Sequence, residues 1–208
     1  DWFFHCHLRY HMEAGMARVF SYQEQGPQHR VNLGPESLDP YYFMLEGALQ
    51  THMSMGMATV QNSRNNFNAL WDLGWGDTAK PYPHGHRAEY EVDLTYSRYF
   101  NPNLSAFGGM RLTNYDTSKD RGIFGLYYRL PYLIQSEVLV DTEADVRLRL
   151  GKVFQITSRL SVFAEGEYDT NTRWEWTSGA KYFLSKRWSL IGQYHSDHGL
   201  GAGLNFRF

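Results

Sequence analysis

The sequence predicts an all-β protein: a transmembrane, antiparallel, up-and-down β-barrel preceded by a non-barrel N-terminal tail. The first indication is the C-terminus, where apolar residues occupy every second position from Leu200 to the terminal Phe208, as in the closing strand of a membrane barrel. The second is composition, because a 16% aromatic content accompanies a mean hydropathy of only -0.52. The third is a repeated alternation of apolar and polar residues from residue 66 onward, which is typical of strands with one face toward lipid.

Length and charge narrow the classes further. A chain of 208 residues is one domain by default, with room for a short appendage. A net charge of -2 gives no reason to expect a nucleic acid as a partner. No run of about 18 apolar residues is present, so no transmembrane helix is expected. The single cysteine excludes an intrachain disulfide.

Three segments follow one another along the chain. Residues 1–20 hold a metal-ligand motif between two short apolar stretches, and residues 21–65 form a linker with several glycines and prolines and a stretch rich in Met and His. Residues 66–208 form the barrel. About ten strands are expected there, and a further hairpin within residues 41–60 gives twelve as the alternative. Both counts are even, as required if both ends of the barrel lie on one side of the membrane.

Each expected strand has an apolar face that defines it. These strands cover residues 67–75, 88–97, 104–112, 124–130, 134–140, 144–150, 160–168, 174–184, 188–195 and 200–208. The turns near residues 101–103, 131, 157–158 and 185–186 are tight, whereas the loops at 76–87, 114–121 and 169–173 are longer or more polar. This alternation places the tight turns and the N-terminus on the periplasmic side.

A soluble sandwich is the competing interpretation, because its strands alternate as well. Almost every strand, however, carries charged residues on its polar face, and the apolar faces carry Tyr and Trp near the strand ends, as interface belts do. With about ten strands the lumen is narrow enough for side chains to fill. We therefore expect Glu165, Glu167 and Glu175 to pair with the basic residues of the same interior, Arg147, Arg149 and Lys181, rather than to act as acid–base catalysts.

The N-terminal motif has the residue types and spacing of copper ligands, and in this chain it is either a copper site or the metal-free remnant of one. His5, Cys6 and His7 are consecutive, and His11 and Met16 follow them. Alternation along a strand places His5 and His7 on one side and Cys6 on the other. A thiolate, an imidazole and a thioether are three of the ligands of a blue-copper site, which still lacks its second His.

This stretch resembles the C-terminal ligand segment of the multicopper oxidases, and is most similar to those of the copper resistance protein A type. The resemblance implies that His5 and His7 bind a type 3 copper pair and that Cys6, His11 and Met16 bind type 1 copper. The only other His-x-His pair is His84 and His86, so the chain by itself is not expected to be an enzyme. The parent protein is then a multicopper oxidase of which this is a fusion fragment.

Several later segments resemble the outer-membrane copper resistance protein B family. They are Ala69 to Trp71, Tyr90 to Arg98, Gly122 to Tyr132, the strand from Leu160 and the terminal Phe strand. The resemblance implies a bacterial outer-membrane protein, in contact with outer-membrane lipid, that binds or passes copper ions at the periplasmic face of a narrow barrel. It also implies a periplasmic multicopper oxidase as partner.

The family usually carries a segment rich in Met and His ahead of its barrel, and His52, Met53, Met55 and Met57 match it here. Thioethers suit Cu(I), and in an extended segment the three methionines share one side. The alternatives are lipid-facing or gap-filling methionines and a structural barrel or narrow channel without a metal role. A further cluster, His195, Asp197 and His198, is either a divalent-ion site or a solvated loop.

Overall fold

The computed structural model describes residues 2–5, 17–20, 39–75, 88–114, 120–171 and 173–208. The chain forms two units, residues 1–41 and residues 42–208. In the first unit, β1 (Trp2–His5) and β2 (Ala17–Phe20) pair antiparallel, with Trp2 opposite Phe20. The backbone of His5 lies in β1, whereas Cys6, His7, His11 and Met16 lie outside the described residues.

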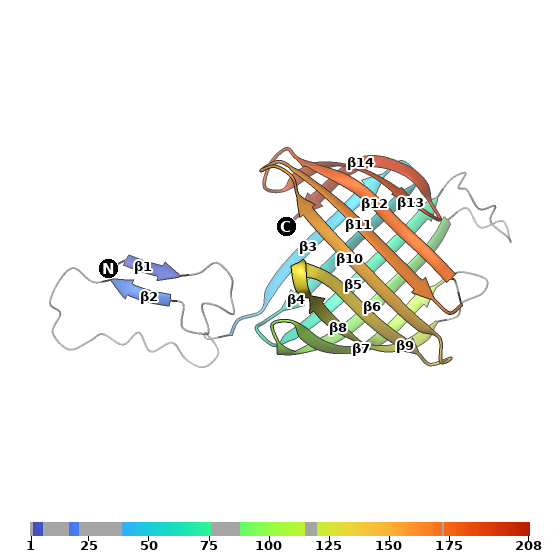
Figure 1. The fold of residues 1–208 in the computed structure, drawn as a ribbon, viewed down its shortest axis with the longest axis horizontal. Coiled ribbons are helices and arrows are strands. Elements are labelled where there is room, and N and C mark those ends of the chain that lie inside the picture. The colour runs from blue at the N-terminus through green and yellow to red at the C-terminus, as the bar shows by residue number, and fades with distance from the viewer. Residues whose placement is uncertain (1, 6–16, 21–38, 76–87, 115–119, 172) are drawn as a thin grey trace. The chain divides into compact units, whose positions relative to one another are not determined.

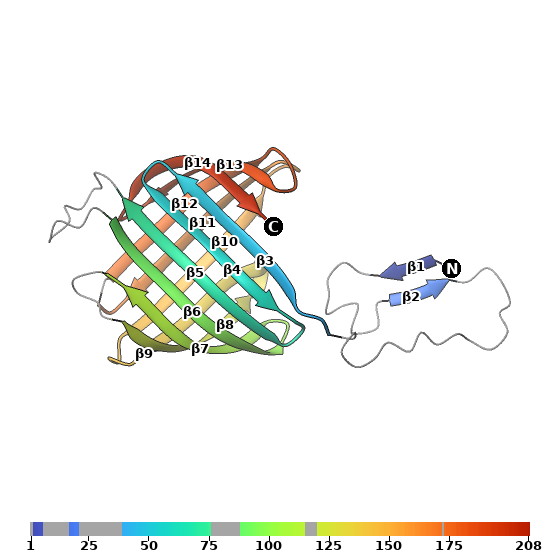
Figure 2. The ribbon, with the colours of Figure 1, turned by 180° about the vertical axis from the view of Figure 1, so that it is seen from behind.

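The second unit is a closed barrel of twelve antiparallel strands (Figure 1). Each strand pairs with its neighbours in sequence, and the sheet closes where β14 pairs with β3; Figure 2 shows these two strands side by side. The strands are β3 (Tyr42–Gln50), β4 (Met53–Gln61), β5 (Asn65–Trp75), β6 (Ala88–Asn101), β7 (Leu104–Thr113), β8 (Arg121–Leu130), β9 (Ile134–Asp141), β10 (Val146–Gln155), β11 (Leu160–Asp169), β12 (Arg173–Phe183), β13 (Trp188–His195) and β14 (Gly199–Arg207). A short 3-10 helix, η2 (Pro131–Leu133), joins β8 to β9.

The prediction of ten strands is wrong and the alternative of twelve is correct, because β3 and β4 complete the barrel. Their outward face is hard to recognise in the sequence because it contains Gly47 and Gly56. The indole of Trp71, on β5, lies where side chains of these glycines would lie: a Cβ on Gly56 would be 2.1 Å from it. The apolar surface of this hairpin is therefore supplied in part by the next strand.

The two faces of the sheet differ as the alternation predicts. Large apolar side chains point outward and are exposed, among them Phe67, Leu94, Phe124, Leu148 and Trp176. Buried positions are mostly polar or charged, and the apolar cluster of Phe107, Ile123 and Leu139 is small. A closed sheet leaves no unpaired strand edge, as lipid requires. The chain is thus a transmembrane barrel and not a sandwich with a dry aromatic core.

The barrel has two rims that differ in their connections. The terminal rim, where β3 begins and β14 ends, carries the connections at residues 62–64, 102–103, 131–133, 156–159 and 184–187. The far rim, opposite it, carries those at residues 51–52, 142–145 and 196–198, and there β5 is followed by β6, β7 by β8 and β11 by β12. The grouping of the tight turns with the barrel ends is confirmed. No helix in the described part of the chain is long and apolar enough to cross a membrane.

Candidate metal centre

The three methionines of β4 point into the barrel. Met53 is fully buried, Thr59 is buried and Val60 is exposed, and Met55 and Met57 line cavities in the lumen, so the odd-numbered residues of β4 point inward. A Cβ on Gly201, in β14, would lie 2.9 Å from the methyl group of Met53. The absence of a side chain at Gly201 therefore leaves the space that Met53 occupies. The prediction that the methionines share one side is confirmed, and the lipid-facing alternative is wrong.

Two of the thioethers converge on one amide. Nε2 of Gln193, on β13, donates to Sδ of Met53 at 3.1 Å and to Sδ of Met55 at 2.9 Å. A thioether is a weak acceptor, so this pair is held by a donor that a soft cation can replace. Met57 lies further along β4 and lines another part of the lumen together with Met44. His52 lies in the 51–52 turn of the far rim, where its carbonyl oxygen accepts from the backbone N–H of Trp75 at 2.9 Å.

An imidazole–carboxylate cluster lies toward the same rim. It comprises Asp72 of β5, His195 at the end of β13 and His198 in the turn before β14. Nε2 of His198 is 3.3 Å from Oδ1 of Asp72, and Nε2 of His195 is 3.6 Å from Oδ2. The two imidazole rings stack with their centroids 4.7 Å apart.

Local backbone features bring these side chains together. A Cβ on Gly74 would lie 2.3 Å from the ring of His198, so this strand position must lack a side chain. Gly199 has φ +74°, a conformation that glycine adopts without strain and that returns the chain into β14 directly after His198. The backbone N–H of Asp197 donates to Nδ1 of His195 at 3.1 Å, which orients that ring.

The electrostatics of His198 are set by Asp72. Burial alone would lower the pKa of His198, but the Asp72 carboxylate outweighs burial and holds that pKa above its usual value. Oδ1 of Asp72 and both ring nitrogens of His198 are buried without a hydrogen-bond partner among the described residues. The 3.3 Å contact between them is therefore an ion pair without hydrogen-bond alignment.

Next to the cluster lies a cavity of about 210 Å³ that is lined both by a β4 methionine and by members of the cluster. Met55, Asp72 and His195 form one side of it. Six carboxylates but only two arginines line the cavity, namely Asp72, Glu91, Asp93, Glu165, Glu167, Glu175, Arg147 and Arg149. Its net negative charge favours a cation.

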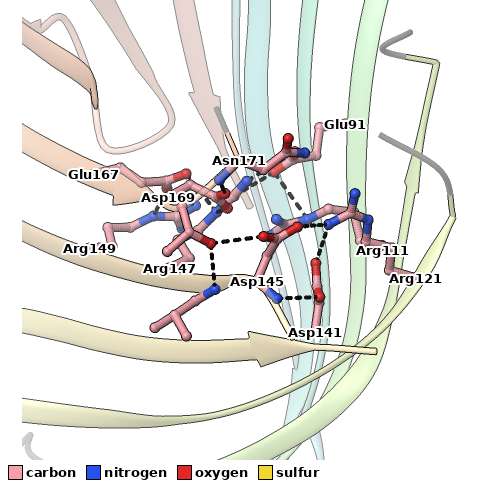
Figure 3. A network of polar contacts seen from close by, with 12 residues as sticks. Glu91, Arg111, Arg121, Asp141, Asp145, Arg147, Arg149, Glu167, Asp169 and Asn171 are labelled. Carbon is pink, nitrogen blue, oxygen red and sulfur yellow. Dashed lines mark hydrogen bonds and ion pairs between the residues drawn. The ribbon is translucent and has the colours of Figure 1, made fainter. Parts of the chain in front are cut away.

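The opposite wall is an extended ion-pair network (Figure 3). Arg147 bonds to Glu91 at 2.8 Å, to Glu167 at 2.7 Å and to Asp169 at 2.9 Å. Arg149 bonds to Glu167 at 2.8 Å and lies 3.5 Å from Glu165, and Arg111 holds Asp93 through two bonds of 2.7 Å. The predicted pairing of Arg147 and Arg149 with Glu165 and Glu167 is confirmed.

Two members of the predicted pairing behave differently. Lys181 bonds to Glu46 of β3 at 2.8 Å rather than to the acids of β11 and β12. Glu175 lies opposite Glu167 in the β11–β12 register and lines the cavity, and no ion pair of Glu175 occurs among the described residues. The pairing of Lys181 follows from the closure of the barrel by β3, which the ten-strand prediction omitted.

A second cavity, of about 410 Å³, lies on the side of the terminal rim. Met44, Met57, Asn66, Asn68, Tyr127 and Glu165 are among its lining residues. Met55 lines the first cavity and Met57 the second, so the methionines of β4 run along the lumen from the far rim inward.

The sequence reasoning singled out the methionines and the two C-terminal histidines but missed Asp72, Gln193 and Met44. Asp72 carried one usable signal, since it is the only acid on the inward face of β5. Gln193 and Met44 carried none, because their role depends on which strands meet across the barrel.

The fold and the facing of its side chains define the class: an outer-membrane-type β-barrel. A family model for multicopper oxidases matches residues 1–26, the segment that contains the motif from His5 to Met16. No curated protein sequence matches the chain to a significant degree.

Solved structures similar to the chain are porins. The KdgM porin has 13% sequence identity and a TM-score of 0.48, and the match covers 80% of this chain and 98% of that one. The KdgM porin in complex with disordered oligogalacturonate has 12% identity and a TM-score of 0.49 over the same shares. A mutant porin of Rh. blastica has 10% identity and a TM-score of 0.40, over 79% of this chain and 89% of that one.

Proposed function

We propose that this chain is a copper-resistance barrel of the bacterial outer membrane, similar to the copper resistance protein B family, that binds or passes copper in its lumen. The observation that carries the proposal is the convergence of Met53 and Met55 on the inner wall, with Met57 further along the same strand. Thioethers are soft ligands that select Cu(I) over the alkali and alkaline-earth ions.

The position of these ligands refines the proposal. The N-terminus and the terminal rim face the periplasm in this proposal, and a periplasmic multicopper oxidase is the partner there. Met53 then lies toward the outer opening and Met57 toward the interior, so in this proposal copper binds in the outer part of the lumen and not at the periplasmic face that the family resemblance implies. The Arg147 network fills the opposite wall, which favours ion binding over a wide aqueous pore.

The test is a Cu(I) titration of the full chain in detergent, in competition with a chromophoric Cu(I) chelator. The variant Met53→Leu, Met55→Leu, Met57→Leu should lose at least about tenfold in affinity, because Leu keeps the volume and removes the sulfur. Met110→Leu is the matched control, since Met110 points outward and is 50% exposed. Equal binding by both variants would leave a structural barrel or narrow channel as the function.

A second candidate function rests on the family-model match at residues 1–26. In this proposal the tail supplies His5, Cys6, His7, His11 and Met16 to a multicopper oxidase tethered to the outer membrane. Copper loading should then give the intense blue absorption of a Cu(II)–thiolate site, and Cys6→Ser should remove it. A colourless loaded protein counts against this function and leaves the lumen proposal unaffected.

A further inference from the structure

We propose that Asp72, His195 and His198 form a second metal site, for Cu²⁺, at the far rim of the barrel. The site uses none of the β4 methionines, so it stands whether or not they bind Cu(I). It is the one group of three or more potential metal ligands among His, Cys, Asp and Glu within the described residues.

The separations between the ligand atoms suit one ion. A first-row metal bound by nitrogen and oxygen at about 2.0–2.2 Å has neighbouring ligand atoms about 2.8–3.1 Å apart in the tetragonal arrangement that Cu²⁺ prefers, and about 3.4 Å apart in a tetrahedral one. The two histidine-to-aspartate separations are 3.3 and 3.6 Å, and all three ligand atoms lie within 4.8 Å of one another. Only small side-chain movements separate this arrangement from a closed ligand set.

Several polar atoms of the cluster form no hydrogen bond within the described part of the chain. His198 is 2% exposed, yet neither of its ring nitrogens has a hydrogen-bond partner among the described residues, and the same holds for Oδ1 of Asp72. Buried polar atoms without hydrogen-bond partners destabilise a fold. An ion between them satisfies the carboxylate and one ring nitrogen of His198 at once.

The donor set indicates which ion is bound. Two imidazoles and one carboxylate form a harder set than the thioethers of Met53 and Met55, and imidazole sites bind Cu²⁺ more tightly than the other first-row divalent ions. Asp72 and His195 also line the cavity of about 210 Å³, which leaves an open side for water. The carboxylates around that cavity outnumber its arginines and add negative potential for a divalent cation.

Loading has a local structural consequence. Nδ1 of His195 accepts from the backbone N–H of Asp197, so the neutral ring carries its proton on Nε2, the atom that faces Asp72. When Cu²⁺ takes the place of that proton, a proton must occupy Nδ1, and the contact with Asp197 is lost. Binding should therefore rearrange the 196–198 turn.

The test is Cu²⁺ binding to the full chain in detergent, followed by electron paramagnetic resonance and metal analysis. All samples carry Cys6→Ser, so that the single thiol neither reduces nor binds the ion. The chain with only Cys6→Ser, the parent, should bind one more equivalent of Cu²⁺ than the variants that also carry His198→Gln or Asp72→Asn. The spectrum of this extra equivalent should show hyperfine structure from nitrogen ligands. The affinity at this equivalent should fall more than about 100-fold, because changes outside the ligand shell alone cost about 10–100-fold.

Two further measurements separate this site from the methionines and from effects of misfolding. The Met53→Leu, Met55→Leu variant should retain the Cu²⁺ equivalent, which separates this site from the Cu(I) proposal. In the parent, whose histidine cluster is unchanged, Cu²⁺ should protect His195 and His198 from modification by diethylpyrocarbonate. It should also speed hydrogen exchange at the Asp197 amide. Neither measurement depends on the folding of a variant with an altered cluster. Equal Cu²⁺ stoichiometry in parent and variants, or no protection, overturns the proposal and leaves Asp72 and His198 as a plain ion pair.

Discussion

Two walls of the same lumen solve the problem of buried polar groups in opposite ways. On the wall built from β6, β7, β10 and β11, each arginine of the network contacts at least two carboxylates, and Arg147 contacts three. On the wall built from β4, β5 and β13, atoms of Asp72 and His198 have no hydrogen-bond partner within the described part of the chain, and two thioethers share one amide. The paired wall is a structural support, and the wall with spare bonding capacity is where a ligand is expected.

The difference also explains why charge alone is a poor guide to function in this barrel. The densest group of charges, Arg147 and Arg149 with their carboxylate partners, forms ion pairs between neighbouring strands (Figure 3). The candidate ligands are instead neutral or weakly paired side chains next to glycines such as Gly74 and Gly201. If the two walls differ in this way, substitutions on them should have different consequences for stability and for metal binding.

The largest effect is expected on the paired wall. Arg147→Ala removes a guanidinium that is 4% exposed and leaves Glu91, Glu167 and Asp169 without their shared cation. Breaking a buried ion pair in this way costs about 3–5 kcal/mol. Urea unfolding in detergent, followed by circular dichroism, should show a loss of this size.

Arg129→Ala is the control for that measurement, because Arg129 is an exposed arginine of β8 near the terminal rim. Its substitution should change the unfolding free energy by less than about 0.5 kcal/mol. If both variants unfold alike, the Arg147 network does not support the barrel and the proposed contrast between the walls fails.

Much of this organisation was predictable from alternation alone. The facing of the strands, the pairing of Arg147 with the β11 acids and the inward side of Met53 all follow from a period of two. The β3–β4 hairpin was left open because Gly47 and Gly56 carry no apolar side chain and Trp71 covers them from the next strand. The meeting of Asp72 with His195 and His198 depends on barrel closure, which brings β5 near β13 and which no local pattern contains.

An intermediate effect is expected at the far rim. A Cβ on Gly74 would lie 2.3 Å from the ring of His198, so Gly74→Ala must displace that ring. Overpacking of this kind costs about 1–3 kcal/mol. The same variant should lose the Cu²⁺ equivalent while Cu(I) binding by the methionines persists.

Gly192→Ala is the matched control, since a Cβ there meets no atom of the described residues within 4 Å. It should leave both stability and Cu²⁺ binding unchanged. Retained Cu²⁺ binding in Gly74→Ala would show that His198 is not required for that equivalent.

The smallest effect has the opposite sign. Glu175 faces the cavity directly across the strand pair from Glu167, and like charges in that position destabilise a sheet by about 0.2–1 kcal/mol. Glu175→Gln should therefore raise the unfolding free energy by up to about 1 kcal/mol, measured by the same urea titration. Glu167→Gln should lower it, because Glu167 contacts both Arg147 and Arg149. A stabilising Glu175→Gln that also weakens Cu²⁺ binding would indicate that the barrel maintains this repulsion to attract a cation, whereas two destabilising variants would mean that Glu175 belongs to the paired wall.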